Sequence, residues 1–167
     1  IDVLNGVASG FMVVASFSLS IALFILQNYE IAIISLPLGF VSLAFYKYHK
    51  IPSKIFPGDS GALTLGAVYG TIAIVGHVEI IAAVALLPAI INSFLFLSSM
   101  KRIVEHRQIK GKPVDHTEDF RLQATSDKTA PITLVRLILA SGPLSEKQVG
   151  YAIFKLAIFS GILAVIT

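Results

Sequence analysis

Five long apolar stretches constrain the fold of this chain more than any other feature. They cover residues 7–26, 31–46, 62–76, 80–97 and 149–167, and Lys155 is the only charged residue within them. An α-helix needs about 20 mostly apolar residues to cross a bilayer, with a range of about 17–25. Two of the stretches contain a proline, Pro37 or Pro88, which packed membrane helices tolerate. The sequence therefore predicts an all-α fold, a polytopic transmembrane helix bundle with about five spans.

The composition agrees with a membrane protein and excludes several other classes. Hydrophobic residues make up 55% of the 167 residues and charged residues 14%, whereas soluble domains contain about 25% charged residues. The chain has no cysteine, which excludes disulfides and thiolate metal sites within it. A formal net charge of +3 is too small to indicate binding to nucleic acid.

The lysine and arginine residues lie almost entirely on one side of the predicted bundle. Twelve of the thirteen occur in residues 47–61 and 98–148, and none occurs in the loops 27–30 and 77–79. By the positive-inside rule, the basic side is cytoplasmic, so residues 98–148 form a cytoplasmic loop between the fourth and fifth spans. The thirteenth, inside the last span, can reach back to the same interface. We expect any chemistry on this face, where residues 2–6 also lie.

A short apolar run, residues 132–140, interrupts the predicted cytoplasmic loop. It is too short to cross a bilayer, and Arg136 is its one charged residue. The run predicts either an interfacial helix or a segment that packs under the bundle.

A polar turn, PGDSG, stands at the start of the third apolar stretch. As a helix N-cap, Asp59 would accept a hydrogen bond from the first helical turn, and Gly58 and Gly61 would shape the turn. Alternatively, the Asp59 carboxylate holds a divalent cation. Mg²⁺ prefers carboxylates together with phosphate oxygens, and the free N–H groups at the start of a helix attract the same phosphates.

A second candidate lies in the basic stretch KRIVEHRQIKGK. One interpretation is a cluster that anchors the loop to lipid headgroups. The other is that Arg107 binds a phosphate with its planar guanidinium and that His106 bonds to the same ligand. The remaining histidines, His49, His77 and His116, have no partner at metal-ligand spacing, and we expect them at the surface or at the membrane interface.

Three further features have structural and functional interpretations. Asp2 and Asn5 precede the first span as loop and cap residues would, and Phe56 suits the membrane interface. The Gly-x-x-x-Gly patterns at residues 6–10 and 66–70 predict close approach of helices.

Taken together, four motifs resemble one family. The motifs DVLNGVASG, KIFPGDSGAL, EHR and LILASGPLSEKQV occur in the order, and on the side, found in the polyprenyl-phosphate N-acetylhexosamine-1-phosphate transferases. The resemblance covers the whole chain but only the C-terminal half of the family. The family's acidic pair in an earlier cytoplasmic loop, and an asparagine upstream of Asp2, are not in this sequence. Because the chain also begins at Ile1 without methionine, we expect it to be part of a larger protein.

The resemblance assigns the nucleotide-binding residues. Phe56 matches an aromatic residue that stacks on uracil, and Asn5 matches the residue that reads the edge of the base. Gly58 belongs to the Gly-Asp-Ser motif and is expected at the substrate. Asp2 matches an acidic position of the bacterial members and is expected near the same ligand.

The resemblance also assigns the catalytic residues and the metal. Asp59 matches the aspartate that binds Mg²⁺, for which Mn²⁺ is a possible substitute. His106 and Arg107 match the residues that contact the diphosphate and the amino sugar. The implied reaction joins a UDP-sugar to a polyprenyl phosphate at the cytoplasmic face of the lipid bilayer, without nucleic acid, in a protein that is a possible homodimer.

The stretch from Gly142-Pro143 to Glu146-Lys147 resembles the archaeal and eukaryotic branch of the family. That branch transfers N-acetylglucosamine 1-phosphate from UDP-N-acetylglucosamine to dolichyl phosphate and releases UMP, the first step of N-glycan assembly. The membrane is the plasma membrane in a prokaryote and the endoplasmic reticulum in a eukaryote. The alternative is a bacterial phospho-N-acetylmuramoyl-pentapeptide or undecaprenyl-phosphate transferase.

Two other classes remain open on the sequence alone. Half of a membrane transporter would carry ionisable residues near the middle of its spans, and Lys155 near one end is the only such residue here. A purely structural membrane subunit would give no reason for separate loops to match one set of motifs.

Overall fold

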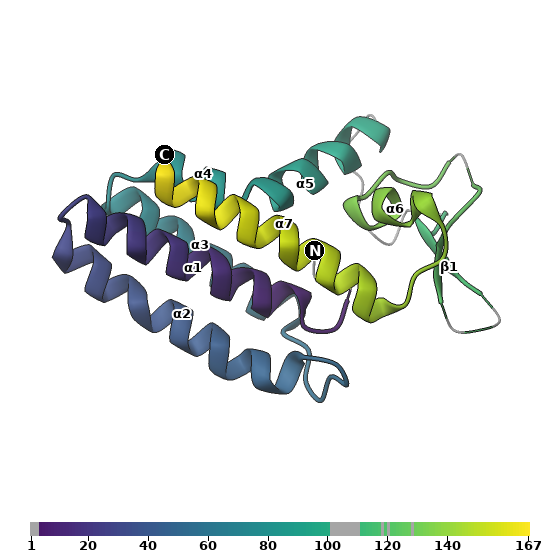
Figure 1. Ribbon diagram of the computed structural model, residues 1–167, viewed down its shortest axis with the longest axis horizontal. Helices are drawn as coiled ribbons and strands as arrows, with labels where there is room; N and C mark the ends of the chain where they lie inside the picture. Colours follow the sequence, from purple (N-terminus) through teal and green to yellow (C-terminus); the bar gives the residue numbers. More distant parts are fainter. Residues whose placement is uncertain (1–3, 101–110, 118, 120, 128) are drawn as a thin grey trace. The chain divides into compact units, whose positions relative to one another are not determined.

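The structure is a computed structural model that describes residues 4–100, 111–117, 119, 121–127 and 129–167. It contains two compact units. The first comprises Ile1–Leu87 and Ile153–Thr167, and the second comprises Pro88–Ala152. Figure 1 shows the elements of both units.

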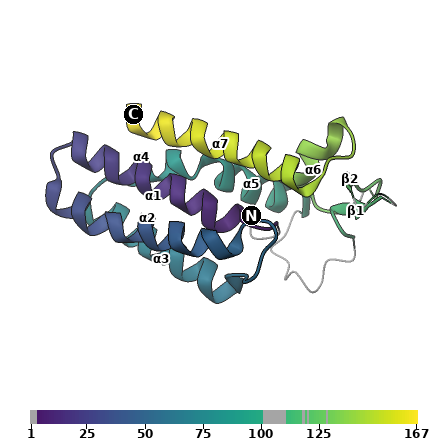
Figure 2. The same cartoon turned by 60° about the horizontal axis from the view of Figure 1, so that its bottom comes forward.

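The first unit is a bundle of helices. It contains α1 (Val7–Ile25), α2 (Tyr29–His49), α3 (Gly58–Val75), α4 (Glu79–Ala85) and most of α7 (Glu146–Ile166). Helix α1 is the central element. Of its most apolar 18 residues 61% are buried, compared with 28% for α2 and 17% for α3. The buried cluster of this unit includes Leu19, Leu23, Ala32, Tyr69, Ala82 and Ala164. Figure 2 shows α2 and α3 running beside α1.

Small polar side chains join α1 to α2. The hydroxyl groups of Ser20 and Ser35 lie 2.6 Å apart, and both residues are almost fully buried. At Gly39, a Cβ atom would lie 3.0 Å from the ring of Phe17, so the backbone of α2 lies directly on that ring. Close approach and interhelical hydrogen bonds are the contacts expected between helices in a membrane, where apolar surface alone gives no attraction.

Glycine also brings α7 against α1. A Cβ atom at Gly10 would collide with the ring of Phe154, and one at Gly161 would collide with the Ser18 hydroxyl. The two contacts advance along both helices in the same order, so α7 runs parallel to α1. Helix packing at residues 6–10 is thereby confirmed. At Gly66 and Gly70 a Cβ atom would meet nothing within 4 Å in the described residues, and packing at this second pattern is not confirmed.

The number of spans agrees with the sequence. Among the described residues, four helices, α1, α2, α3 and α7, are long and apolar enough to cross a membrane, and a fifth span results if α4 and α5 (Leu87–Met100) form one interrupted span. Pro88 stands in the first turn of α5, where its missing N–H group breaks no helical hydrogen bond. Pro37 lies inside α2.

The second unit contains α5, the start of α7 and a small hairpin. Strands β1 (Val114–His116) and β2 (Leu122–Ala124) pair antiparallel, with Asp115 opposite Gln123. Short helices follow, α6 (Leu134–Ile138) and the 3₁₀ helix η2 (Leu139–Ser141).

The apolar run 132–140, predicted as an interfacial helix or as a segment packed under the bundle, forms two short helices, and its arginine has a structural role. Arg136 donates to the backbone carbonyl oxygens of Ala130 (2.6 Å), Pro131 (3.3 Å), Thr125 (3.2 Å) and Asp127 (2.8 Å). A guanidinium with its donors in a fixed planar arrangement can satisfy several carbonyl groups at once. The Arg136 side chain thus joins the backbone of residues 125 and 127 to that of residues 130 and 131.

Candidate functional site

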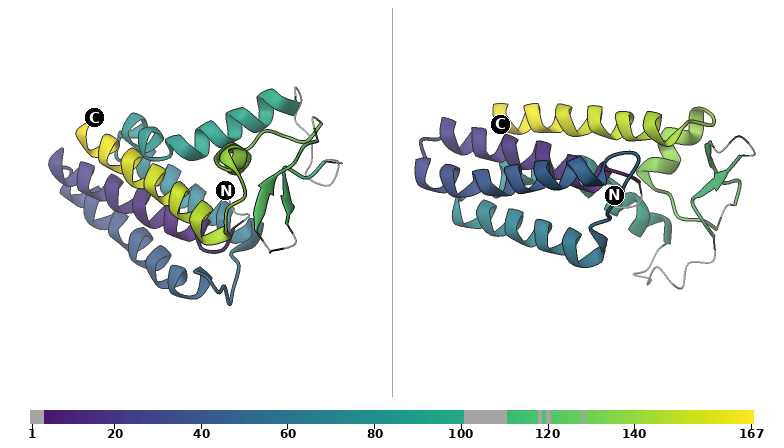
Figure 3. Two further views of the ribbon diagram at one scale, coloured as in Figure 1. Left: turned by 45° about the vertical axis from the view of Figure 1, so that its right-hand side comes forward. Right: turned by 90° about the horizontal axis from the view of Figure 1, so that it is seen from below.

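The site begins where α1 starts and α2 ends. At Gly6, whose φ is +80°, a Cβ atom would lie 3.1 Å from the Cα atom of Lys50 and 3.7 Å from the carbonyl oxygen of His49. Glycine is required there by its left-handed conformation and by this close contact. The loop 50–57 then leads to α3 at the same end of the first unit (Figure 3). Two of the three predicted polar segments thus meet in this unit.

Asn5 is held at this end because it directly precedes Gly6. The residue as a whole is half-buried, and its Oδ1 atom is buried. Its position beside the end of α2 agrees with both interpretations of Asn5: a residue that binds the ligand, and a loop residue that precedes α1.

The prediction that His49 lies at the surface or at the membrane interface is wrong. It is the last residue of α2 and is fully buried, and its Nδ1 atom lies 2.9 Å from the hydroxyl of Ser9 on α1. The rings of Phe45 and Phe56 lie against it, with centroid distances of 5.7 and 5.2 Å. His49 is therefore a core residue of the site, not a surface or interface histidine.

Phe56 lies on the outer side of His49. Its ring meets the imidazole edge to face at an interplanar angle of 69°, and the residue is 57% exposed. The loop that carries it is fixed by two hydrogen bonds, from the Lys54 amide to the Tyr48 carbonyl (2.9 Å) and from the Ser53 hydroxyl to the Ile55 carbonyl (3.0 Å). An aromatic side chain supported on one side and open on the other is suited to stacking on a planar ligand.

Asp59 is not a helix cap. Helix α3 begins at Gly58, the N-cap position is Pro57, and no side chain caps it. The Asp59 side chain, one residue inside the helix, is exposed and bonds to no other described residue. Gly58 has φ +60°, a conformation that favours glycine. The carboxylate therefore lies at the positive end of the helix dipole, where it can bind a cation or accept a hydrogen bond.

Among the described residues, Asp59 is the carboxylate at this end that could bind a metal, and no cluster of three His, Cys, Asp or Glu side chains occurs. Such a donor set fits Mg²⁺ only if phosphate oxygens, water or other side chains complete the coordination. The predicted residues Asp2, His106 and Arg107 lie outside the described residues.

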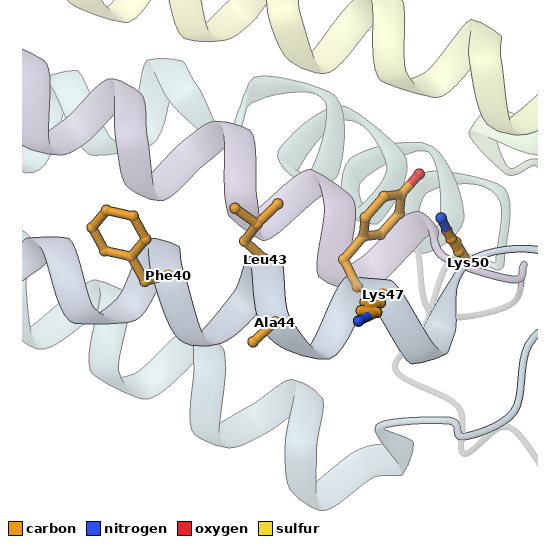
Figure 4. Close-up of a pocket in the computed structure, with 6 residues that line it drawn as sticks. Phe40, Leu43, Ala44, Lys47 and Lys50 are labelled. Carbon is orange, nitrogen blue, oxygen red and sulfur yellow. The ribbon is translucent and has the colours of Figure 1, made fainter.

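A hollow among the described residues lies along α2. A shallow groove of about 440 Å³ is lined by Phe40, Leu43, Ala44, Tyr46, Lys47 and Lys50 (Figure 4). It contains none of the predicted site residues. Apolar side chains with lysines at one end are typical of a surface in contact with lipids that have anionic headgroups.

Comparison with known proteins identifies the family. The sequence model described as glycosyl transferase family 4 matches residues 1–77. A protein of Methanocaldococcus jannaschii named as a glycosyltransferase, MJ1113, is 34% identical over 166 residues, which cover 97% of this chain and 52% of that protein.

Bacterial relatives match over shorter lengths. The phospho-N-acetylmuramoyl-pentapeptide-transferase of Clostridium beijerinckii is 38% identical over 79 residues, 47% of this chain and 24% of that protein. The protein of the same name from Staphylococcus haemolyticus is 28% identical over 117 residues, 69% of this chain and 36% of that protein. This chain thus spans about half the length of MJ1113 and less of the bacterial proteins. With the PGDSG turn at the start of an apolar helix, these matches show that the chain belongs to glycosyl transferase family 4.

Proposed function

We propose that the protein containing this chain transfers a sugar 1-phosphate from a UDP-sugar to a polyprenyl phosphate at the membrane surface. The observation that carries the proposal is the placement of Asp59. Its carboxylate is exposed at the start of an apolar helix, at the same end of the first unit as Asn5 and Phe56. A site at a helix end on the membrane surface is accessible both to a lipid substrate and to a soluble one.

The proposed reaction is a phosphoryl transfer. An oxygen of the lipid phosphate attacks the sugar-linked phosphorus of the UDP-sugar, the bond from that phosphorus to the bridging oxygen breaks, and UMP leaves with the bond electrons. Positioning and charge stabilisation supply most of the catalysis in such reactions. A bound Mg²⁺ would neutralise charge on the diphosphate.

The described residues have separate roles in this proposal. Phe56 stacks on the uracil ring, and Asn5 bonds to the edge of the base. Asp59 supplies one oxygen ligand to the cation, and the N–H groups at the start of α3 attract phosphate. Arg107 and His106 contact the diphosphate and sugar, as the family resemblance implies, while Gly58 and Asp2 complete the substrate site.

We propose UDP-N-acetylglucosamine and dolichyl phosphate as the substrate pair, with Mg²⁺ as the cofactor and the site on the cytoplasmic side. The 34% identity to an archaeal protein along 97% of the chain supports this branch. The second candidate is the transfer carried out by a phospho-N-acetylmuramoyl-pentapeptide-transferase, which the matches to two such proteins favour.

The experiment that separates the two candidates gives the full-length protein both substrate pairs. Membranes that contain it are incubated with radiolabelled UDP-N-acetylglucosamine and dolichyl phosphate, or with labelled UDP-N-acetylmuramoyl-pentapeptide and undecaprenyl phosphate. Label is then followed into the lipid fraction with and without EDTA. We expect Mg²⁺-dependent labelling with the first pair. Labelling with the second pair alone would favour the second candidate, and a folded protein that labels neither lipid contradicts the proposed function.

A further inference from the structure

The buried histidine at the end of α2 connects the two segments proposed to hold the nucleotide base. On one side, its Nδ1 atom bonds to Ser9, four residues after Asn5. On the other side, its ring contacts Phe56. Ser9 and His49 are both fully buried, so this pair has little freedom to move.

His49 combines two interactions, a ring contact with Phe56 and a hydrogen bond with Ser9. Phe56 is 57% exposed, and within the described residues His49 provides its one ring-to-ring contact. The hydrogen bond to Ser9 fixes the orientation of the imidazole, because rotation of the ring would break a buried hydrogen bond. The orientation of the Phe56 ring therefore depends on a bond made inside the bundle.

We propose that His49 is a positioning residue for recognition of the nucleotide base. This role rests on the proposed function. Through Ser9 it fixes the end of α2 against the segment of Asn5, and through its ring it supports Phe56. The distance between the stacking ring and the base-reading amide is then set by the Ser9–His49 pair. Loss of the pair weakens binding of the uridine nucleotide without changing the affinity for the lipid phosphate.

The same helix pair contains a matched control. Ser20 and Ser35 also join α1 to α2 by a buried hydrogen bond, at 2.6 Å. Ser20 lies eleven residues after Ser9 along α1, about 16 Å away at 1.5 Å per residue. If the Ser9–His49 bond served only to pack the two helices, removing either serine hydroxyl would have the same consequence.

The test measures the dissociation constant for UMP and the KM for lipid phosphate in the full-length protein. Four proteins are compared: the unaltered one, Ser9→Ala, His49→Phe and Ser20→Ala. Ser9→Ala removes the hydroxyl with little change in volume, so it is expected to fold even if His49→Phe does not. We expect Ser9→Ala to weaken UMP binding about threefold to tenfold, the usual net value of one hydrogen bond. Ser20→Ala is expected to leave UMP binding unchanged, and all three variants to keep the KM for lipid phosphate.

A double-mutant cycle makes the test specific. If the Ser9–His49 pair acts through Phe56, then Ser9→Ala should add no further loss of UMP affinity in a Phe56→Ala protein. Full additivity of the two losses overturns the inference, as do equal effects of Ser9→Ala and Ser20→Ala in a protein that binds UMP. An unaltered protein that fails to bind UMP overturns the proposed function, and this inference with it.

Discussion

The Phe56 ring meets the His49 ring edge to face, with 5.2 Å between the centroids, and still leaves Phe56 57% exposed. In the proposed function, this exposed ring stacks on uracil, and stacking of a base on an aromatic ring is worth about 1–3 kcal/mol. Phe56→Ala should therefore weaken UDP-sugar binding about tenfold to a hundredfold. Phe40→Ala is the control, because Phe40 is also 57% exposed but lines the groove on α2, which contains none of the predicted site residues. Calorimetry with the purified protein measures both, and unchanged affinity in Phe56→Ala would exclude the stacking role.

The charge distribution predicts the topology of the loops. Gln27, Lys50 and Lys112 are exposed, and this chain has no cysteine, so single cysteines at these positions report on their own surroundings. An impermeant thiol reagent added to sealed vesicles should label Lys50→Cys and Lys112→Cys from one side and Gln27→Cys from the other. Labelling of positions 27 and 112 from the same side contradicts the predicted topology.

Arg107 and Lys112 should tolerate exchange of their cations differently. A guanidinium binds two phosphate oxygens at once, which an ammonium group cannot imitate. Arg107→Lys should therefore lose most transfer activity, and Lys112→Arg should keep it. Initial rates at saturating substrates give the comparison. Equal tolerance of both changes would favour the simpler role, in which the whole basic stretch anchors to lipid headgroups.

Asp127 should make the 125–131 loop sensitive to acid. Its carboxylate accepts hydrogen bonds from the amide (2.8 Å) and the hydroxyl (2.7 Å) of Thr129, and these bonds lower the pKa of Asp127. Because the pKa is lower in the folded protein, the bonds stabilise the loop above the ordinary aspartate value of about 3.9. That contribution is lost as the pH falls through the lowered pKa. The amide resonance of Thr129 should shift in that acidic range, and in Asp127→Asn this transition should be absent.

The membrane helices could be predicted from the sequence because each is a long run of apolar residues. The predicted stretch 7–26 corresponds to α1 (Val7–Ile25) almost residue for residue. The hairpin could not be predicted in the same way. Its strands are three residues long, too short for an alternating pattern, and the loop that follows is organised by the contacts of Arg136.

One detail of the site and one of the second unit could have been predicted from the sequence. Ser35, Ser42 and His49 follow one another at intervals of seven residues, which places them on one face of a helix, and all three are buried. That spacing marks His49 as a packed residue. At the start of α7, Ser145 and Gln148 exchange hydrogen bonds as the Ser-x-x-Gln pattern of a capping box predicts.

The final prediction concerns Asp59, whose place inside α3 now separates its two interpretations. Because Pro57 holds the N-cap position, Asp59→Asn removes no capping hydrogen bond and only weakens a favourable interaction with the helix dipole, worth about 0.3–1 kcal/mol. The melting temperature in detergent should therefore stay nearly the same. A Mg²⁺ ligand is different, because the cation requires the charge of the carboxylate.

Asp59→Asn in the full-length protein should accordingly fold normally and lose nearly all transfer of labelled sugar phosphate to lipid phosphate, with partial recovery in Mn²⁺. Glu79→Gln is the matched control, since Glu79 is also an exposed acidic residue in the first turn of a helix, α4. It should keep full activity. Near-normal turnover of Asp59→Asn at low Mg²⁺ would mean that the carboxylate is not a metal ligand, and that Asp59 contributes only to the dipole of α3.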